Sequence, residues 1–358
     1  MAAPRTRVTQ RMIADMAGVS QSTVSLVLNG KATGERRIPV ATRDRVLEAI
    51  RDTTYVANPV ARSLARRSND LIGVFTYEPA FPSGAADFYT PLLTGIESAA
   101  EGIAADLLVF TSTPVVDGRR RLFHEGNRLR LADGCVLLGR EMDPDELGQL
   151  LDTGYPFVAV GRRDAAEGRV PYVGVDYAAA TRDLARRALR LGHERFGLIR
   201  LPLNAEASRD RRDGIRSALA DGGIDVDDGL VEAEMSSNST VVQAWEAVRA
   251  SEPSIVFVED PVHGDALFSY LAQTGVHVPE QISVIVLGEH SHARDRAIDV
   301  TRLSAPRIEL GARAVAILAE RIAAAQNGHD PGAVHELLPC QIIAGSTLTA
   351  PPAQHLIA

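Results

Sequence analysis

Residues 172–199 read YVGVDYAAATRDLARRALRLGHERFGLI, and this stretch decides the fold class. An apolar run typical of a strand comes first, an amphipathic stretch typical of a helix follows it, and a second apolar run ends the segment. A strand, a helix and a strand in this order predict a right-handed crossover between parallel strands. Helices then cover both faces of the sheet, which is the α/β class.

The same alternation extends over the chain from residue 71 onward. One series runs from LIGVFTY at 71–77 to PFVAVG at 156–161, and it includes GRRRLFHEGNRL at 118–129 as a helical stretch. A second series begins with the YVGVD of the opening stretch and ends with ISVIVLG at 282–288. Two series predict two doubly wound lobes of parallel sheet, with a ligand cleft at the carboxyl ends of the strands.

The segments that follow the two series must be shared between the lobes. We expect an N-lobe of residues 71–170 plus 301–328, a C-lobe of residues 171–300 plus 329–350, and a tail at 351–358. The tail, PPAQHLIA, contains no leucine heptad. Its composition therefore favours a dimer over a tetramer assembled by a coiled coil.

The composition is that of a globular protein without an export signal. The chain has 358 residues, of which 45% are hydrophobic. It holds no apolar run of about 18 residues, and its first residues lack the apolar stretch of a signal peptide, so a cytoplasmic protein is expected. Cys135 and Cys340 each lie in an apolar run, which predicts small buried hydrophobic residues rather than a disulfide or a metal site.

The charge is unevenly distributed along the chain. The net charge is −8, but residues 1–70 carry +6, which leaves −14 for the remainder. Basic side chains gain affinity for nucleic acids by displacing counterions from phosphates. Charge alone does not distinguish such a segment from a solvated basic tail.

The segment VTQRMIADMAGVSQSTVSLVLNG at residues 8–30 predicts a helix, a tight turn and a second helix. Thr9 can cap the first helix, Gly18 permits the turn, and Ser20 can cap the second helix. A third helix is expected from Pro39 through VATRDRVLEAIRD. The side chains expected in the small core of the three helices are Ile13, Met16, Val19, Val24, Val27, Leu28, Val46, Leu47 and Ile50.

This core leaves Gln21, Ser22, Ser25 and Leu26 on the outer face of the second helix. Short polar side chains on a helix with a capped N-terminus suit a recognition helix, because its amide end accepts phosphate and its side chains reach base edges. Leu26 cannot form hydrogen bonds there, but it can pack on a thymine methyl group. A helical hairpin without a DNA role is the alternative.

A short helix is predicted shortly after the third helix, in YVANPVARSLARRSND at residues 55–70. Asn58 is a good N-cap and Pro59 suits the first helical position. The helix has only about two turns, with Val60 and Leu64 among arginines, so it is marginal in isolation.

These segments resemble the LacI/GalR family of bacterial transcription regulators. The similarity lies in IADMAGVSQSTVSLVLNG, ATRDRVLEAI, YVANPVARSLARR and LIGV, and it continues through the opening stretch to PEQISVIVLG and LLPCQIIAGSTL. The resemblance implies a helix-turn-helix headpiece at 1–56, a hinge helix and linker at 57–70, and a core at 71–350 that is similar to periplasmic sugar-binding proteins. It also implies a homodimeric repressor of a pseudo-palindromic operator.

The resemblance assigns roles to residues of the headpiece and hinge. Gln21 and Ser22 are expected to read bases, and Leu64 is expected to enter the minor groove between base pairs, which explains a helix that is marginal without DNA. Leu26 stands where the family commonly has an arginine. The DNA-contacting residues that the resemblance implies are Thr9, Ser20, Gln21, Ser22, Thr23, Ser25, Leu26, Asn29, Ala61 and Leu64.

In the core the resemblance implies a small effector, with a sugar as the family default. Arg211 aligns with the arginine that usually binds the effector, although a surface arginine paired with Asp210 or Asp213 is the alternative. Gly161 and Gly288 replace carboxylates of the family pattern, so an acceptor must come from elsewhere or the effector is an anion. The residues expected around the effector are Phe88, Gly161, Arg211, Glu259, Asp260, Gly288 and Glu289.

Other functional classes lack their motifs. No GxGxxG follows a strand, and neither GxxxxGK[ST] nor GxSxG occurs, so an enzyme is not expected and no cofactor is predicted. Glu289, His290, His292 and Asp295 in GEHSHARD are possible metal ligands, but a polar loop is the simpler interpretation. A periplasmic-type binding protein without a DNA role is the remaining alternative, and it would have no use for the basic N-terminal segment.

Overall fold

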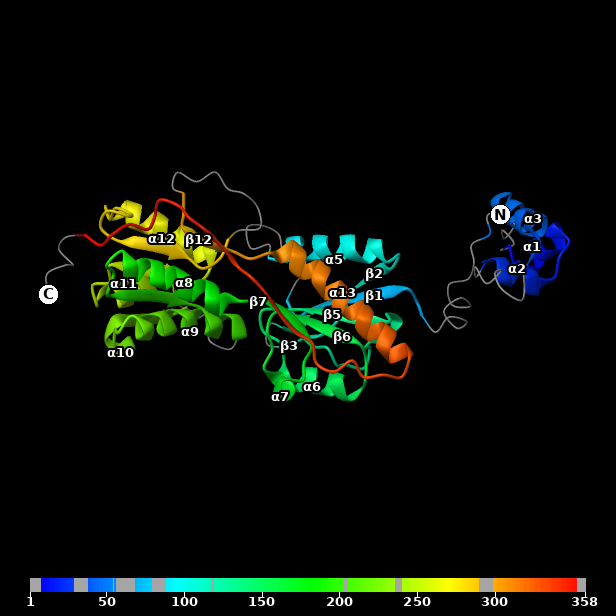
Figure 1. The fold of residues 1–358 in the computed structure, drawn as a ribbon, viewed down its shortest axis with the longest axis horizontal. Coiled ribbons are helices and arrows are strands. Elements are labelled where there is room, and N and C mark those ends of the chain that lie inside the picture. The colour runs from blue at the N-terminus through cyan, green and yellow to red at the C-terminus, as the bar shows by residue number, and fades with distance from the viewer. Residues whose placement is uncertain are drawn as a thin grey trace. The chain divides into compact units, whose positions relative to one another are not determined.

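The structure is a computed structural model that describes residues 8–28, 38–53, 55, 68–78, 88–116, 119–202, 205–235, 240–289 and 299–352. The chain divides into two compact units, one ending at Asp70 and the other beginning at Leu71 (Figure 1). The hinge positions Ala61 and Leu64, together with Asn29, lie outside the described residues, and so do His290, His292 and Asp295. Among the helices of the described ranges, none combines the length and apolar character needed to cross a bilayer.

The first unit contains the predicted helix-turn-helix. Helix α1 covers Gln10–Ala17, α2 covers Gln21–Leu28 and α3 covers Val40–Arg51. Thr9 caps α1 by accepting a hydrogen bond from the Met12 amide, and Gly18 turns the chain with φ +62°. This conformation is one that glycine adopts at little cost.

The core of the three helices differs in part from the expected one. It is formed by Ile13, Ala14, Ala17, Val24, Val46 and Ala49. Met16 and Leu47, both expected inside, are 56% and 39% exposed. Each lies about 100° around its helix from the buried stripe, and alanines occupy the interior positions instead, which lets the short helices approach closely.

The N-lobe of the second unit is a parallel sheet of six strands in the order β13-β7-β6-β5-β1-β2. Its strands are β1 (Leu71–Thr76), β2 (Asp106–Phe110), β5 (Gly134–Leu138), β6 (Phe157–Val160), β7 (Tyr172–Val175) and β13 (His335–Leu338). The register of the central pairs is set by partners such as Val74 and Val136. The strands are nearly continuous apolar runs because both faces of the sheet are covered.

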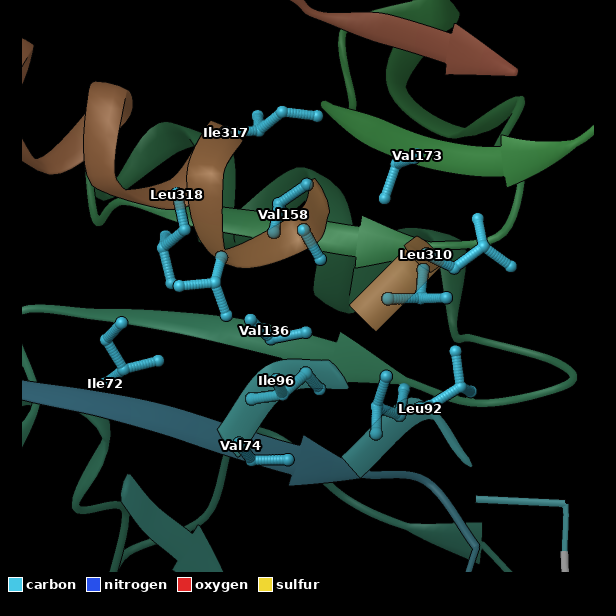
Figure 2. Packing of buried hydrophobic residues seen from close by; sticks show 14 of the residues in the cluster. Ile72, Val74, Leu92, Ile96, Val136, Val158, Val173, Leu310, Ile317 and Leu318 are labelled. Atoms are coloured by element: carbon cyan, nitrogen blue, oxygen red, sulfur yellow. The ribbon is translucent and has the colours of Figure 1, made fainter. Parts of the chain in front are cut away.

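One face of this sheet packs against α5 (Thr90–Gly102) and α13 (Arg307–Gln326). Figure 2 shows Leu92 and Ile96 from α5, and Leu310 and Leu318 from α13, pointing toward the valines of the strands. The two helices lie side by side (Figure 1). They approach so closely that a Cβ atom on Gly95 would lie only 1.9 Å from the Ile308 carbonyl oxygen. Helix α6 (Pro144–Asp152) covers the opposite face.

The C-lobe is a second sheet of six strands in the order β14-β12-β11-β10-β8-β9. Its strands are β8 (Phe196–Arg200), β9 (Leu230–Glu234), β10 (Ile255–Val258), β11 (Ser283–Val286), β12 (Arg302–Ser304) and β14 (Gln341–Ile343), of which β14 is antiparallel to β12. Helices α8 (Tyr177–Arg190) and α9 (Glu206–Asp221) cover one face. Helices α11 (Val241–Arg249) and α12 (Pro261–Gln273) cover the other. Two doubly wound lobes are therefore confirmed.

The expected division of residues between the lobes is wrong at three strands. Strand β7 pairs with β6, and β13 pairs with β7, so both belong to the N-lobe and not to the C-lobe. Strand β12 pairs with β11 and belongs to the C-lobe. The opening stretch 172–199 consequently crosses from one lobe to the other. Its strand, helix and strand are present, but apolar periodicity contains no information about which sheet a strand joins.

The helix expected at residues 118–129 is also absent from the described part of that segment. Arg119–Arg120 form the short strand β4 beside β3 (Val115–Val116), and an irregular segment leads to a 3₁₀ turn at Leu129–Leu131. Long-range hydrogen bonds replace those of a helix: the Glu146 carboxylate accepts from the amides of Leu122 and Phe123, at 3.0 and 3.4 Å. Leu122 is buried as a result.

Candidate functional site

The exposed start of α2 is the first candidate site. Ser20 Oγ accepts a hydrogen bond from the Thr23 amide at 3.2 Å and lies 2.7 Å from Ser22 Oγ and 2.9 Å from Thr23 Oγ1. Gln21 and Ser22 are exposed, whereas Ser25 and Leu26 are only half-exposed. The hydroxyl groups thus surround the positive end of the helix dipole, which favours an anion such as phosphate.

The second candidate site is a cleft between the two lobes, with a volume of about 490 Å³. It is lined by residues that follow the carboxyl ends of β5, β6, β8, β10 and β11, which is where open α/β sheets bind ligands. The structure brings all seven predicted effector residues to this cleft: Phe88, Gly161, Arg211, Glu259, Asp260, Gly288 and Glu289. The volume and location of the cleft match those of small-molecule sites in general.

Arg211 is held firmly inside the cleft by its surroundings. Its Nε donates to the Leu287 carbonyl at 3.1 Å, and its Nη1 donates to the Ala207 carbonyl at 3.1 Å and to Glu259 at 3.4 Å. The guanidinium carbon lies 3.6 Å from the centre of the Tyr177 ring. Arg211 therefore points into the cleft, and the alternative of a surface arginine paired with Asp210 or Asp213 is wrong.

Glu259 is committed to contacts within the protein. It is 5% exposed, and its carboxylate accepts from the Leu201 amide at 2.8 Å, from Ser208 Oγ at 2.5 Å and from Arg211. A buried carboxylate needs such partners to offset its lost hydration. Its contacts position Arg211 and leave little capacity to accept hydrogen bonds from a ligand.

Asp260 and Glu289 also have partners across or beside the cleft. Asp260 caps α12 by accepting from the Val262 amide at 2.8 Å, and its other oxygen lies 3.6 Å from Arg140 Nη2. Glu289 accepts from Ser304 Oγ at 2.6 Å and lies 3.8 Å from Arg307. These two carboxylates are less enclosed than Glu259, so they are the better-placed hydrogen-bond acceptors.

Phe88 provides an aromatic surface beside these groups. The guanidinium carbons of Arg140 and Arg307 lie 5.6 and 5.7 Å from the centre of its ring. Both distances are within the range of cation–π contacts. The ring and the two arginines therefore form one side of the site.

Sequence reasoning missed the arginines that follow β6. Gly161 has φ +99°, and a Cβ atom there would lie 3.2 Å from two nitrogens of Arg163. Arg163 is 4% exposed and reaches the carbonyls of Gly139 and Val160 as well as Glu206. Burial lowers the pKa of its guanidinium, and Glu206 opposes that shift. The only signal in the sequence is the pair of arginines directly after a strand and a glycine.

Tyr177 was missed for a different reason. It directly follows Asp176, which caps α8, and so it looks like an ordinary first-turn residue. Burial raises the pKa of its phenol, and the Arg211 cation opposes that shift. The tyrosine is thus uncharged, and the Arg211 guanidinium stacks on its ring.

The charges of the described lining residues balance. The cations are Arg140, Arg162, Arg163, Arg211 and Arg307, and the anions are Glu141, Asp210, Glu259, Asp260 and Glu289. Most are joined in ion pairs with one another. Such a cleft has no excess charge with which to attract a charged ligand.

Comparison with known proteins gives two matching domain families. The profile described as bacterial regulatory proteins of the lacI family matches residues 11–58, and that of a periplasmic binding protein-like domain matches residues 185–348. The regulator CelR of Thermobifida fusca is 31% identical over 326 residues, which cover 89% of this chain and 93% of that protein. The repressor PurR of Photobacterium profundum is 26% identical over 326 residues, covering 87% and 90%.

Solved structures agree with these matches. A CelR–cellobiose complex is 25% identical and covers 95% of this chain and 100% of its own, with a TM-score of 0.65. The lac repressor dimer bound to operator and an anti-inducer is 20% identical and covers 96% and 100%, with a TM-score of 0.74, which supports the fold. With its helix-turn-helix, its two-lobed core and a relative above 30% identity, the chain belongs to the LacI family of bacterial transcription regulators.

Proposed function

We propose that this regulator is a homodimeric repressor that binds a pseudo-palindromic operator and alters its operator affinity when a neutral sugar occupies the interlobe cleft. The observation that carries the sugar part is the cleft itself: Arg211 is fixed over Tyr177 in a site whose charges balance. The similarity to CelR, which has been solved with cellobiose, supports the same class of effector.

The chemistry of the cleft supports an uncharged polyhydroxylated effector. An anionic effector would require a cation without a carboxylate partner, whereas Arg211 already has Glu259. Asp260 and Glu289 retain the capacity to accept hydrogen bonds from hydroxyl groups, and Phe88 adds an aromatic ring to the lining of the cleft. A volume of about 490 Å³ accommodates a disaccharide, so cellobiose is the first compound to test.

The headpiece supports the operator part of the proposal. Gln21 and Ser22 are exposed at the start of α2, in position to contact bases, while the Ser20 and Thr23 hydroxyls flank the helix N-terminus and suit phosphate contacts. Ser25, Leu26 and Thr9 complete the proposed surface, with Asn29, Ala61 and Leu64 added on the family resemblance alone. Two headpieces in a dimer would read two half-sites.

We also propose that the protein is not an enzyme and that it acts in the cytoplasm, where its operator would be. The relatives named above are transcriptional regulators. The carboxylates and arginines of the cleft are engaged with one another, which suits binding better than proton transfer.

Selection of bound sequences from random DNA by the full-length protein tests this proposal. We expect enrichment of a single pseudo-palindromic site, and weaker or stronger retention of that site when cellobiose is added. Enrichment of one unrepeated half-site would contradict the dimer. Absence of any enrichment would favour a binding protein without a DNA role.

A further inference from the structure

The two lobes are joined beside the cleft by ion pairs between the segment after β6 and the first two turns of α9. The participating side chains, which we name the interlobe clasp, are Arg162, Arg163, Asp164, Glu206, Arg209 and Asp210. The first three belong to the N-lobe and the last three to the C-lobe. Any opening of the cleft that moves β6 away from α9 must break these contacts.

The inner pair of the clasp is buried. Arg163 Nη1 donates to Glu206 at 3.1 Å, and the side chains are only 4% and 13% exposed. Opening the lobes would leave Arg163 with the Gly139 and Val160 carbonyls of its own lobe but without a counter-charge. Separating one partner from a buried pair is strongly unfavourable, because the remaining charge is uncompensated.

Gly161 makes room for this pair. A side chain at position 161 would press on the Arg163 guanidinium and would have to adopt φ +99°, which is unfavourable for any residue with a Cβ atom. Gly161 therefore has two effects. It leaves the cleft wall without a carboxylate acceptor at this position, and it leaves space for Arg163 to extend across the wall toward α9.

The outer pair has the geometry of a strong ion pair. Arg162 donates through Nε at 3.0 Å and through Nη2 at 2.7 Å to the two oxygens of Asp210. Arg209 Nη2 donates to Asp164 at 3.0 Å in the opposite direction, from the C-lobe to the N-lobe. Bidentate arginine–carboxylate contacts constrain direction as well as distance.

Two further ion pairs between described residues across the cleft are longer. Arg140 lies 3.6 Å from Asp260, and Arg307 lies 3.8 Å from Glu289. Among these ion pairs between described residues, those of the clasp are the shorter ones. We propose that the clasp holds the cleft closed in the protein that is free of both effector and operator, so that this form already has the lobe arrangement that an effector requires.

This closure has a consequence for effector affinity, which rests on the proposed function. The apparent affinity of a ligand falls in proportion to the fraction of protein in the binding-competent state. A protein that loses the clasp through Glu206 or Arg209, which do not line the cleft, would therefore bind cellobiose more weakly although no lining residue has changed.

Interlobe distances in the full-length, ligand-free protein test the proposal independently of any effector. Spin labels are attached to cysteines introduced at the exposed positions Asp145 on α6 and Ala266 on α12. Cys340 is replaced by serine, and labelled subunits are diluted with unlabelled ones so that only distances within one subunit are measured by pulsed electron spin resonance. We expect one narrow distribution for the otherwise unaltered protein.

The decisive variant is Arg162→Gln combined with Arg163→Met. We expect its distribution to broaden and to shift to longer distances by more than about 2 Å, the scale of hinge motions rather than of side-chain adjustment. The matched control is Arg212→Gln, because Arg212 also pairs with a carboxylate, donating through Nε to both oxygens of Glu232 at 2.8 and 2.9 Å, but within the C-lobe. Its distribution should equal that of the parent.

A charge exchange separates the clasp from a general effect of mutation. Arg162→Asp with Asp210→Arg should restore the parent distribution, whereas Arg162→Asp alone should broaden it. If the double variant at 162 and 163 loses its circular dichroism signal, the exchange pair decides the question, since these side chains are partly exposed. An unchanged distribution after loss of the clasp, or equal broadening in Arg212→Gln, would overturn the proposal while leaving the operator and sugar hypotheses intact.

Discussion

The headpiece and the cleft use charged and polar side chains in opposite ways. Across residues 8–28 and 38–53, the ion pairs are limited to Arg43 with Asp44, 3.9 Å apart, and Arg11, Arg45 and Arg51 are exposed. In the cleft, arginines such as Arg163 and Arg211 are enclosed and paired with carboxylates. The difference indicates that the headpiece retains its charge for an external partner, whereas the core uses its charge for internal geometry.

Salt concentration should produce the largest difference between the two regions, because it should change the affinity of the headpiece for operator far more than the affinity of the cleft for its ligand. We expect operator affinity to fall by about 10³- to 10⁵-fold between 50 and 200 mM salt if six or more phosphates are contacted. Cellobiose affinity should stay within severalfold over the same range, because enclosed pairs are screened much less than exposed charges. Fluorescence anisotropy and calorimetry measure the two affinities. Equal salt slopes for both ligands would remove the distinction.

Arg211→Ala should weaken cellobiose binding by roughly 10- to 100-fold, since a charge-assisted hydrogen bond contributes about 1.5 to 3 kcal/mol. Operator binding by the unliganded variant should persist. The neighbouring Arg212→Ala is the control, because Arg212 pairs with Glu232 instead of lining the cleft. Titration calorimetry distinguishes the two variants, and a normal response of Arg211→Ala to cellobiose would exclude Arg211 from the site.

Gln21→Ala should relax operator specificity at one base pair of each half-site. A bidentate contact from glutamine to adenine discriminates by about 1 to 3 kcal/mol, which is roughly 5- to 150-fold. Competition binding with operators substituted at each position identifies the base pair. Cellobiose affinity in the absence of DNA should be unchanged. A uniform loss over all sequences would instead assign Gln21 to phosphate.

Ser20→Ala should have the smallest effect of these predictions, and the effect should be on the stability of the headpiece. Loss of an N-cap side chain costs about 1 kcal/mol, and here Ser20 Oγ accepts from the Thr23 amide at 3.2 Å. We expect faster amide hydrogen exchange confined to the headpiece, with the core unaffected. Ser22→Ala serves as the control, since Ser22 follows the cap position. Protection equal to that of the parent would show that Ser20 contributes little as a cap.

The sequence predicts best where structure depends on neighbouring residues. Thr9 and Gly18 act on amides and dihedral angles within their own turn, so the helix-turn-helix followed directly from the residue types. The alternation of strands and helices was equally local. The position of Arg211 in the cleft came from family resemblance, and the structure adds the Tyr177 ring and the Leu287 carbonyl that hold it there.

The sequence predicts least where partners lie far apart in the chain. Strands β13 and β14 are separated by two residues, yet they join different sheets, and nothing in their apolar pattern distinguishes them. Arg163 meets Glu206 across 43 residues. The segment 118–129 is held by Glu146 rather than by its own helical hydrogen bonds. Each of these features depends on a contact that periodicity cannot reveal.

The most direct test of the account is the coupling between the cleft and the operator. Cellobiose affinity is measured with and without bound operator, and operator affinity with and without saturating cellobiose, on the same full-length protein. Thermodynamic linkage predicts that both affinities change by one common factor, which we expect to be about 5- to 150-fold. Cellobiose binding in the cleft that leaves operator affinity unchanged would contradict the account.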